Sequence, residues 1–429
     1  MNAISTAGRW LRRCWPVGML LLFVLALVVW AALQLGAWHH WRQAQKCLAQ
    51  GRARQARQHL AWCLKLWPNR VSVHLLAARA ARQDGDGAEA ERQLGEAERL
   101  VPDGSEELIR EWTLNRAAQG DLTVAEAHLR PAIRSPEWGP AVCAALAEGY
   151  LRNYRGPEAL AVLDVWLEQQ PDNLHALLLR GDVWRKAEAL AQAIPCYQRI
   201  LDLDPEHDQA RRWLALCLLD NGQPAAALSH WQYLQERYPD DNEVLISLAR
   251  CRLGLGESEA ARRLLEHVLT VHPHEAAALH TLGAIQLQAG QLAEAEMLLC
   301  RALRVAPRDY KINMLLAQVY RQQRRIAEAE KQEEKVRRLE ARWKQFRQIV
   351  RNLAEHPHEP ELLCQMGEVL LDLGYDDLGH RWLLSALQED AACRRGHELL
   401  ARWYEEHQDA SRAAYHRKQA NTLLSAGQG

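Results

Sequence analysis

Apolar residues recur along most of this chain at the three- and four-residue spacing of amphipathic helices, in short runs that come in pairs. The stretch 174–205 shows one such pair clearly. Its two apolar stripes are Leu174, Leu177, Leu178, Gly181 and Trp184, then Ala193, Tyr197, Ile200, Leu201 and Leu203. Pro205 then stops the second helix, because a proline ring cannot continue the backbone hydrogen bonding. The pattern predicts two helices for each stretch of this kind.

The pairs repeat with a nearly constant period. The marking residues are the prolines Pro68, Pro102, Pro136, Pro171, Pro205, Pro239, Pro273 and Pro307, and the alanines Ala56, Ala90, Ala125, Ala159, Ala193, Ala227, Ala261, Ala295 and Ala329. Each series is spaced by 34 residues with a single gap of 35. The links between paired helices are short and turn-rich, so paired helices are expected to be antiparallel neighbours. A fixed period of this length indicates stacked helical repeats.

Small residues on the paired helices are expected to let the two backbones approach closely. Gly181 and Gly283 lie on first helices, and the periodic alanines lie on second helices. Larger residues, Tyr197, Trp231 and Leu299, are expected to fill the space beside them.

These units resemble the tetratricopeptide repeat family, whose hallmark is W-x2-L-G-x2-Y, then A-x3-F-x2-A and a terminal proline. The matching residues are Leu177, Arg180, Gly181, Trp184, Ala193, Tyr197, Ile200 and Pro205 in one unit, and Leu279, Leu282, Gly283, Gln286, Ala295, Leu299, Ala302 and Pro307 in another. The resemblance covers residues 37–341 with about nine units, and two further units fit at 358–425. It implies an all-α, right-handed superhelix of about eleven helix pairs, with a concave groove that binds peptides or protein surfaces.

The N-terminal segment has a different character. No charged residue occurs between Cys14 and Trp41, and the apolar core runs from Val17 to Leu35. Nineteen helical residues rise about 28 Å, close to the roughly 30 Å of a bilayer's hydrocarbon layer. A transmembrane helix at 17–36 is therefore expected, after a short basic tail at 1–16. A buried core helix and a cleaved signal peptide are the alternatives, although Leu35-Gly36-Ala37 is a poor cleavage site.

Arginine and tryptophan residues flank this segment. They are Arg9, Arg12 and Arg13 before it, Arg42, Lys46, Arg52, Arg54 and Arg57 after it, and Trp10, Trp15, Trp30, Trp38 and Trp41 near its ends. Tryptophan favours the headgroup layer of a bilayer, and the excess of cations after the segment slightly favours a cytoplasmic repeat domain. The short basic N-terminus fits the opposite topology, so both orientations stay open. The cations after the segment either contact anionic lipid or act as topology signals only.

An insertion interrupts the period after Ala329, where the next small-residue marker, Gly379, comes 16 residues late. Within Lys331–Pro357 the apolar residues follow a heptad spacing. They are Val336, Leu339, Trp343, Phe346, Val350 and Leu353. A lengthened second helix, extended over 342–357 and packed on the following unit, is one interpretation. A coiled-coil homodimer through 331–355 is the other.

The charge distribution bears on the class of partner. The formal net charge is −1, but residues 1–83 carry 12 Arg or Lys and no Asp or Glu. The rest of the chain is therefore acidic. We do not expect a nucleic-acid-binding protein, because such a protein would carry its positive charge on the folded domain. The ten cysteines form no C-x-x-C motif, so they are expected to be small buried fillers rather than zinc ligands or disulfides.

No recognisable catalytic constellation occurs in the chain. Three features resemble ligand sites: the two His-Pro-His turns at 272–274 and 356–358, the Cys393 and His397 pair, and the run from Asp84 to Gly87. Each is interpreted as turn or helix decoration, because the further ligands of a metal site are missing. No catalytic residue, metal site or cofactor is expected, and almost every residue belongs to a repeat or to the anchor.

The family resemblance places first-helix residues on the concave groove. The candidate partner-binding residues are Arg79, Arg110, Glu148, Arg152, Asp182, Arg185, Arg212, Arg250, His280, Gln318 and Arg321. The Lys/Asn clamp of chaperone-binding members is not reproduced, since Leu75, Arg79, Arg110 and Leu114 stand at the matching positions. The arginines favour acidic or carboxylate-bearing protein or peptide partners, because a guanidinium pairs with a carboxylate through two hydrogen bonds.

The sequence thus predicts a membrane-anchored scaffold or adaptor without catalysis of its own, acting in assembly, secretion or envelope biogenesis. One alternative is an adaptor subunit that regulates a membrane protease, secretion or envelope or lipid-synthesis complex. A repeat-bearing transferase of unrecognised type is the second alternative. Residues 426–429 are expected to form a short tail.

Overall fold

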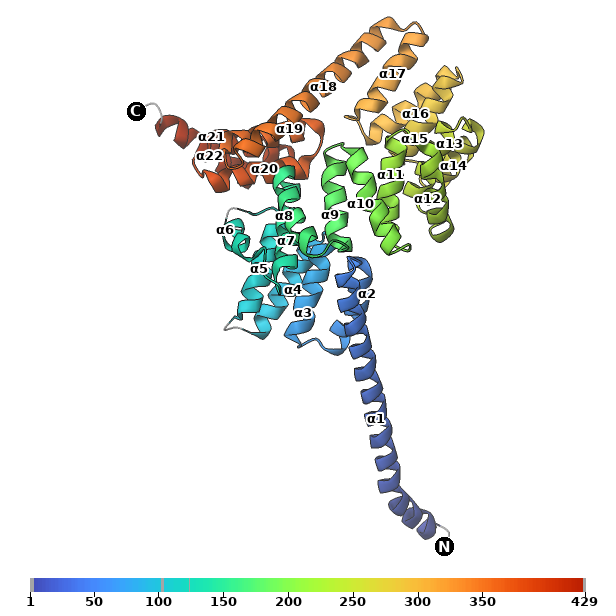
Figure 1. Ribbon diagram of the computed structural model, residues 1–429, viewed down its shortest axis with the longest axis vertical. Helices are drawn as coiled ribbons and strands as arrows, with labels where there is room; N and C mark the ends of the chain where they lie inside the picture. Colours follow the sequence, from blue (N-terminus) through green and yellow to red (C-terminus); the bar gives the residue numbers. More distant parts are fainter. Residues whose placement is uncertain (1–3, 102–103, 123, 427–429) are drawn as a thin grey trace. The chain divides into compact units, whose positions relative to one another are not determined.

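A computed structural model describes residues 4–101, 104–122 and 124–426, with side chains described from residue 24 onward, 354 and 425–426 aside (Figure 1). Twenty-two α-helices, one 3-10 helix and no strand occur in these residues. They form eleven helix pairs, which confirms the predicted all-α solenoid. The chain divides into two compact units, residues 1–153 with 158–180 and residues 154–157 with 181–429.

The first unit contains the membrane candidate and the early repeats. Its helices are α1 (Ile4–Ala49), α2 (Ala53–Leu66), α3 (Val71–Gln83), α4 (Gly87–Leu100), α5 (Glu106–Ala118), α6 (Ala125–Leu129), η1 (Arg130–Ala132), α7 (Gly139–Arg152) and most of α8 (Gly156–Gln169). Helix α9 (Leu174–Lys186) spans the boundary between the two units. Helix α1 passes without interruption from the apolar stretch into the residues that pack on α2.

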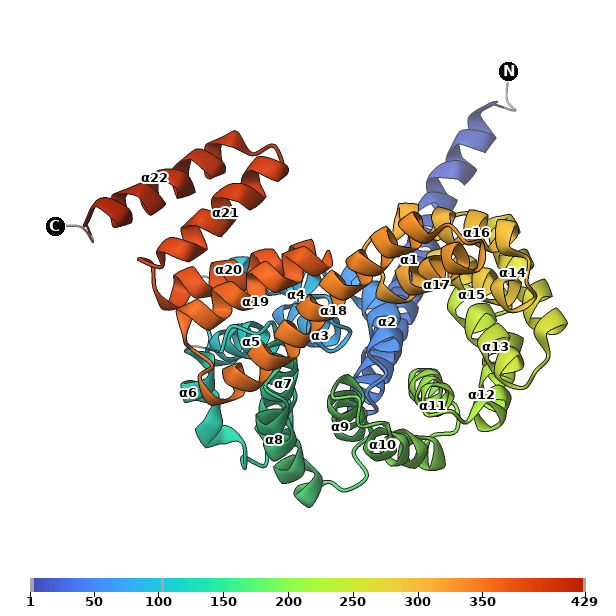
Figure 2. The same ribbon diagram turned by 90° about the horizontal axis from the view of Figure 1, so that it is seen from above.

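The second unit contains the later repeats, which Figure 2 shows as successive helix pairs. Its helices are α10 (Leu190–Leu203), α11 (Asp208–Asp220), α12 (Pro224–Arg237), α13 (Asn242–Gly254), α14 (Ser258–Val271), α15 (Ala276–Gln288), α16 (Leu292–Val305), α17 (Tyr310–Gln322), α18 (Ile326–Glu355), α19 (Pro360–Leu373), α20 (Asp376–Glu389), α21 (Arg394–Glu406) and α22 (Ala410–Ala426). Each second helix also contacts the first helix of the next pair, from α10 to α21.

Close packing within the pairs depends on the small residues, as the sequence predicts. A Cβ atom added at Gly181 would lie 2.7 Å from the ring of Tyr197, and one added at Gly283 would lie 2.9 Å from Leu299. The large partners Tyr197, Leu299 and Trp231 are fully buried. Interiors packed this tightly leave no room for an extra carbon, so these positions fix the separation of the two helices.

One repeat departs from the expected pair of full helices. Helix α6 has only five residues, from Ala125 to Leu129, and it continues as the 3-10 helix η1. Pro131 lies within η1 and explains the early end, because it has no N–H to donate and its ring clashes with the carbonyl group four residues earlier.

A polar contact recurs between the two helices of five repeats. A first-helix side chain contacts a second-helix side chain 19 residues later in the pairs His40–His59, His74–Gln93, Arg211–His230, Asn313–Gln332 and His397–His416. In the last four of these repeats, the first-helix residue also bonds the backbone carbonyl six residues earlier. The same geometry at the same repeat position indicates a structural role for this contact.

The inserted residues lengthen α18 to 30 residues. Ile349 and Leu353 are buried in a core shared with α19, α20 and α21, and Leu339, Trp343, Phe346 and Val350 pack against that core. The Trp343 ring also lies edge-on to Tyr375, with 6.2 Å between ring centroids. Residues of the same chain therefore pack against much of the heptad seam.

Candidate protein-binding face

Within each unit, first helices of successive repeats contact one another, and in both units we call the surface of the first helices the first-helix face; the candidate partner-binding residues lie on first helices. In the first unit Glu111 of α5 is fully buried and accepts hydrogen bonds from two arginines of α3. Arg79 Nε lies 2.6 Å from Glu111 Oε1, and Arg82 Nη1 lies 2.9 Å from Oε2. Arg79 also pairs with Glu107 at 2.9 Å. The Arg79 charge is thus neutralised within the chain.

Arg110 of α5 does not join this ion-pair cluster. Its guanidinium carbon lies 3.7 Å from the centre of the Trp138 ring, close enough for a cation–π interaction. Arg79 lies farther from the same ring, at 5.8 Å. The structure therefore brings Arg79 and Arg110 together around one indole ring.

Glu148 of α7 is the most perturbed carboxyl group on this face. Burial raises its pKa to about 7, against the opposing charges of Arg82 and Arg152. Its Oε1 lies 3.7 Å from Nε2 of the buried His175. The Arg152 side chain is exposed. Glu148 therefore changes charge near neutral pH while the arginines around it stay charged.

In the second unit, Asp182 and Arg185 of α9 form one polar cluster. Arg185 Nη2 lies 3.1 Å from Asp182 Oδ1, and the Tyr197 hydroxyl donates to the same oxygen at 2.8 Å. Arg185 also stacks on the Trp213 ring at 4.1 Å. This cluster ties α9 to both α10 and α11.

Arg212 and Arg250 are ion-paired with carboxylates of neighbouring repeats. Arg212 Nη2 lies 2.7 Å from Asp241, and Nη1 lies 3.3 Å from Glu243. Arg250 Nη2 lies 2.8 Å from Asp220. Like the Arg79 pairs, these bonds join the first helices of consecutive repeats. The sequence predicts that these arginines bind an acidic partner. In the structure, several of them already form ion pairs with carboxylates of the same chain.

His280 of α15 lies near both basic and acidic side chains of neighbouring first helices. Its pKa is lowered by burial and by the charges of Lys311 and Arg250, against the opposing charge of Asp309. Lys311, at the start of α17, is exposed and is not among the partner-binding residues predicted from the sequence. Its place four residues after Pro307 marks it as a first-helix residue, which is the signal that could have identified it.

The last two candidates lie farther along the face, on α17. Gln318 is exposed. Arg321 is 64% exposed and forms an ion pair with Glu333 of α18. They do not join the cluster around His280 through any hydrogen bond among the described residues.

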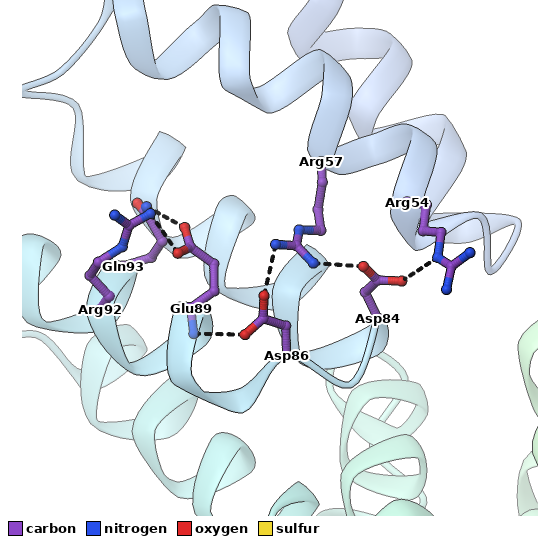
Figure 3. Close-up of polar contacts among 7 residues, drawn as sticks. All are labelled: Arg54, Arg57, Asp84, Asp86, Glu89, Arg92 and Gln93. Carbon is purple, nitrogen blue, oxygen red and sulfur yellow. Dashed lines mark hydrogen bonds and ion pairs between the residues drawn. The ribbon is translucent and has the colours of Figure 1, made fainter. Parts of the chain in front are cut away.

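The basic first repeat also has internal partners (Figure 3). Arg57 Nη1 lies 2.6 Å from Asp84 and Nη2 lies 2.8 Å from Asp86, while Arg54 reaches Asp84 at 3.3 Å. Asp86 also accepts the backbone N–H of Glu89 and so caps α4. The run that resembles a calcium loop therefore binds arginines and caps the start of α4. Among the described residues no group of three or more His, Cys, Asp or Glu is placed to hold a metal ion.

The other residues that resemble metal ligands each have a different side-chain partner in the structure. His397 contacts His416, with 2.9 Å between their Nδ1 atoms, and Cys393 lies 3.5 Å from Cys364 between sulfur atoms. His358 of the second His-Pro-His turn bonds Glu389 at 2.8 Å.

The apolar part of α1 is exposed along the described length. A segment from Val24 to Ala49 is long and apolar enough to cross a membrane, with only 6% of its most apolar window buried. The exposed side chains are Val24, Leu25, Leu27, Val28, Val29, Trp30, Leu33 and Leu35. The beginning of the predicted 17–36 segment and the flanking Arg9, Arg12 and Arg13 lie outside the described side chains.

Two tetratricopeptide repeat models match this chain. One matches residues 42–105, 144–205, 185–242 and 280–343, more than half of the chain, and the other matches 218–285. A comparison with curated proteins finds no match.

Solved structures with a similar arrangement include a tetratricopeptide repeat protein from Parabacteroides merdae, 14% identical over 66% of this chain and 97% of that chain, with a TM-score of 0.45. The human IFIT1 dimer with m7Gppp-AAAA is 17% identical over 82% and 90%, with a TM-score of 0.40. The MamA protein is 20% identical over 39% and 92%, with a TM-score of 0.32.

Proposed function

This chain belongs to the tetratricopeptide repeat family, and from that premise we propose that it is a single-pass membrane protein that holds a scaffold for protein partners at the membrane surface. The repeats supply a long surface built by stacking neighbours rather than a catalytic centre. The anchor confines that surface to the membrane and so raises its effective concentration toward partners there.

The exposure of the apolar stretch of α1 is the observation that carries the proposal. Leu25 is 59% exposed, Val28 58% and Leu35 69%, although apolar side chains of a soluble helix are normally covered. The stretch continues directly into the first repeat, where Ala37 and Ala44 are fully buried against α2. Retention of the segment, rather than cleavage near Ala37, is the state that this packing supports.

Membrane retention of the full-length chain tests the anchor. We expect the wild-type protein to resist alkaline carbonate extraction. The Leu25→Arg/Val28→Arg variant should be extracted, because each arginine costs about 2.5–3.5 kcal/mol near the centre of a spanning helix. Leu25→Ala/Val28→Ala is the matched control and should stay in the membrane. Extraction of the wild type, or processing after residue 37, would contradict the proposal.

For the partner-binding face we propose the region around Arg250, His280 and Lys311 as the contact for an acidic segment of a protein partner. Arg250 has one carboxylate partner, and Lys311 has no ion pair among the described residues. The positive charges of Arg250 and Lys311 both lower the pKa of the half-buried His280. Other candidates, such as Arg79 and Arg212, each hold two carboxylates.

A photo-crosslinker distinguishes this face from the rest of the solenoid. We expect His280→p-benzoylphenylalanine in the full-length membrane protein to form a specific adduct. The same crosslinker at Arg263, which is exposed on the second helix α14, should not form that adduct. Adding Arg250→Glu/Lys311→Glu should remove the adduct, while Arg263→Glu/Arg304→Glu should leave it. Equal adducts at both positions would reject this face.

A further inference from the structure

Helix α2 folds back along the end of α1 that adjoins the apolar stretch. Nδ1 of His59 lies 2.9 Å from Nδ1 of His40, and farther along α2 the Cys63 thiol donates to the carbonyl oxygen of Ala37 at 3.4 Å. At the end of α2 the indole N–H of Trp67 donates to Oε1 of Gln34 at 2.6 Å. The partners of α2 on α1 thus follow one another in steps of three residues, from His40 through Ala37 to Gln34, toward the apolar stretch.

The turn after α2 therefore lies level with the end of the apolar stretch. Gln34 is adjacent to Leu35, the last residue of that stretch. Trp38 lies about one helical turn beyond Gln34, about 6 Å along the axis. A headgroup layer is of similar thickness, since a bilayer of about 40–45 Å contains about 30 Å of hydrocarbon. If α1 spans a bilayer, Trp67 and Trp38 both lie within that layer.

The side chains at this level and over the next two turns of α1 have the composition of a membrane interface, and Trp62 stacks on His40 with 5.6 Å between ring centroids. We call Trp38, Arg42, Trp62, Lys65, Trp67 and Arg70 the membrane-proximal surface. Trp38 is 52% exposed and Trp62 50% exposed. The guanidinium of Arg42 lies over Trp38 at 4.5 Å, and that of Arg70 lies over Trp67 at 4.4 Å. Each arginine thus lies beside an indole ring of the kind that prefers headgroups.

Charge distinguishes the two ends of α2. At its beginning, away from Gln34, Arg54 and Arg57 are paired with Asp84 and Asp86 (Figure 3). At its end, Lys65 and Arg70 are exposed, and no carboxylate within ion-pair distance is found for them among the described residues. The uncompensated cations are therefore those level with the end of the apolar stretch.

We propose that the membrane-proximal surface binds the phosphate groups of anionic phospholipids, so that the first repeat lies against the bilayer. The inference rests on the proposed membrane anchor. Lys65, Arg70 and Arg42 supply the positive charge, and Trp38, Trp62 and Trp67 supply the interfacial rings. Two contacts, one through α1 and one through the turn after α2, limit the rotation of the first repeat about the anchor.

Hydrogen exchange of the full-length chain in lipid nanodiscs tests the inference. Nanodiscs of phosphatidylcholine alone are compared with nanodiscs of phosphatidylcholine and phosphatidylglycerol in equal parts. We expect slower exchange around residues 65–73 only with the anionic lipid, by about fivefold for each basic residue that contacts the surface, and loss of the difference in concentrated salt. Lys65→Glu/Arg70→Glu should abolish the difference, and Arg263→Glu/Arg304→Glu, at exposed second-helix sites, should keep it.

The possible results distinguish the proposed headgroup contact from the proposed membrane anchor. If the chain stays in the nanodiscs and residues 65–73 exchange equally in both lipids, the headgroup contact is wrong and the anchor stands. If the wild-type chain is not retained by either nanodisc, both proposals fail. If the double variant loses helicity, the lipid and salt dependence of the wild type alone decides the question.

Discussion

His397 and His416 face each other across α21 and α22, both nearly buried, with 2.9 Å between their Nδ1 atoms. One imidazole must donate and the other accept, so the contact requires at least one neutral ring. The pKa of His416 is lowered by burial, by His397 and by His380. The pKa of His380 is lowered by burial, by His407 and by Arg412, against Asp377.

We predict that acid weakens the last helix pair. A histidine whose folded pKa lies below its unfolded value of about 6.5 contributes stability above that value and loses it as the pH falls through the folded pKa. Once the pH dependence of intrinsic amide exchange is divided out, the protection factors of the α22 amides should therefore fall between about pH 7 and pH 5. His416→Gln copies the His74–Gln93 pair of an earlier repeat and should reduce this pH dependence. An unchanged pH profile in that variant would contradict the assignment.

Gly149 is predicted to be irreplaceable in α7. An added Cβ would lie 2.2 Å from the carbonyl oxygen of Ala117, and backbone cannot move aside cheaply. Gly149→Ala should lower the free energy of unfolding by about 1–3 kcal/mol or more. Gly95→Ala is the control, because Gly95 in α4 has nothing within 4 Å and should gain about 0.5–1 kcal/mol of stability from helix propensity. Urea unfolding measures both, and equal effects would reject this packing.

Glu111 is predicted to be required because of Arg82. Both side chains are buried, and Glu111→Leu removes the carboxylate that Arg82 contacts, which should cost about 3–5 kcal/mol. Leucine stands at the equivalent position of several other repeats, so the change is compatible with helix packing. Glu111→Leu/Arg82→Leu should be more stable than Glu111→Leu alone. A double variant that is simply the sum of the two single losses would show that the pair is not coupled.

Cys364 and Cys393 are predicted to form a disulfide under oxidation. Their sulfur atoms lie 3.5 Å apart, and the pKa of the Cys364 thiol is raised mainly by burial, so the reaction should be slow. Diamide treatment followed by alkylation and mass spectrometry should find these two residues linked. Among the cysteines whose side chains the structure describes, Cys196 and Cys300 are partly exposed and should be alkylated first in the native protein. Rapid alkylation of Cys364 in the folded chain would contradict the burial.

The period of 34 residues by itself determined the helices, their pairing and the family of the fold. Each repeat contains its own helix-ending residue and small residues. The spacing of residues within a repeat is therefore enough to predict its two helices. Pro131 shows the limit of the period, because it shortens α6 although Ala125 and Pro136 still mark a full repeat there.

Only the tertiary structure decided which of the candidate arginines are neutralised by a carboxylate of the same chain. The carboxylates that hold Arg79 and Arg212 lie about one repeat later in the chain, and those that hold Arg57 lie in the turn that ends the next helix. The spacing places these residues on first helices or beside a membrane segment, but ion pairing depends on which side chains meet once the repeats are stacked. The same reason applies to the turn after α2, whose position beside Gln34 follows from helix packing and not from any local pattern.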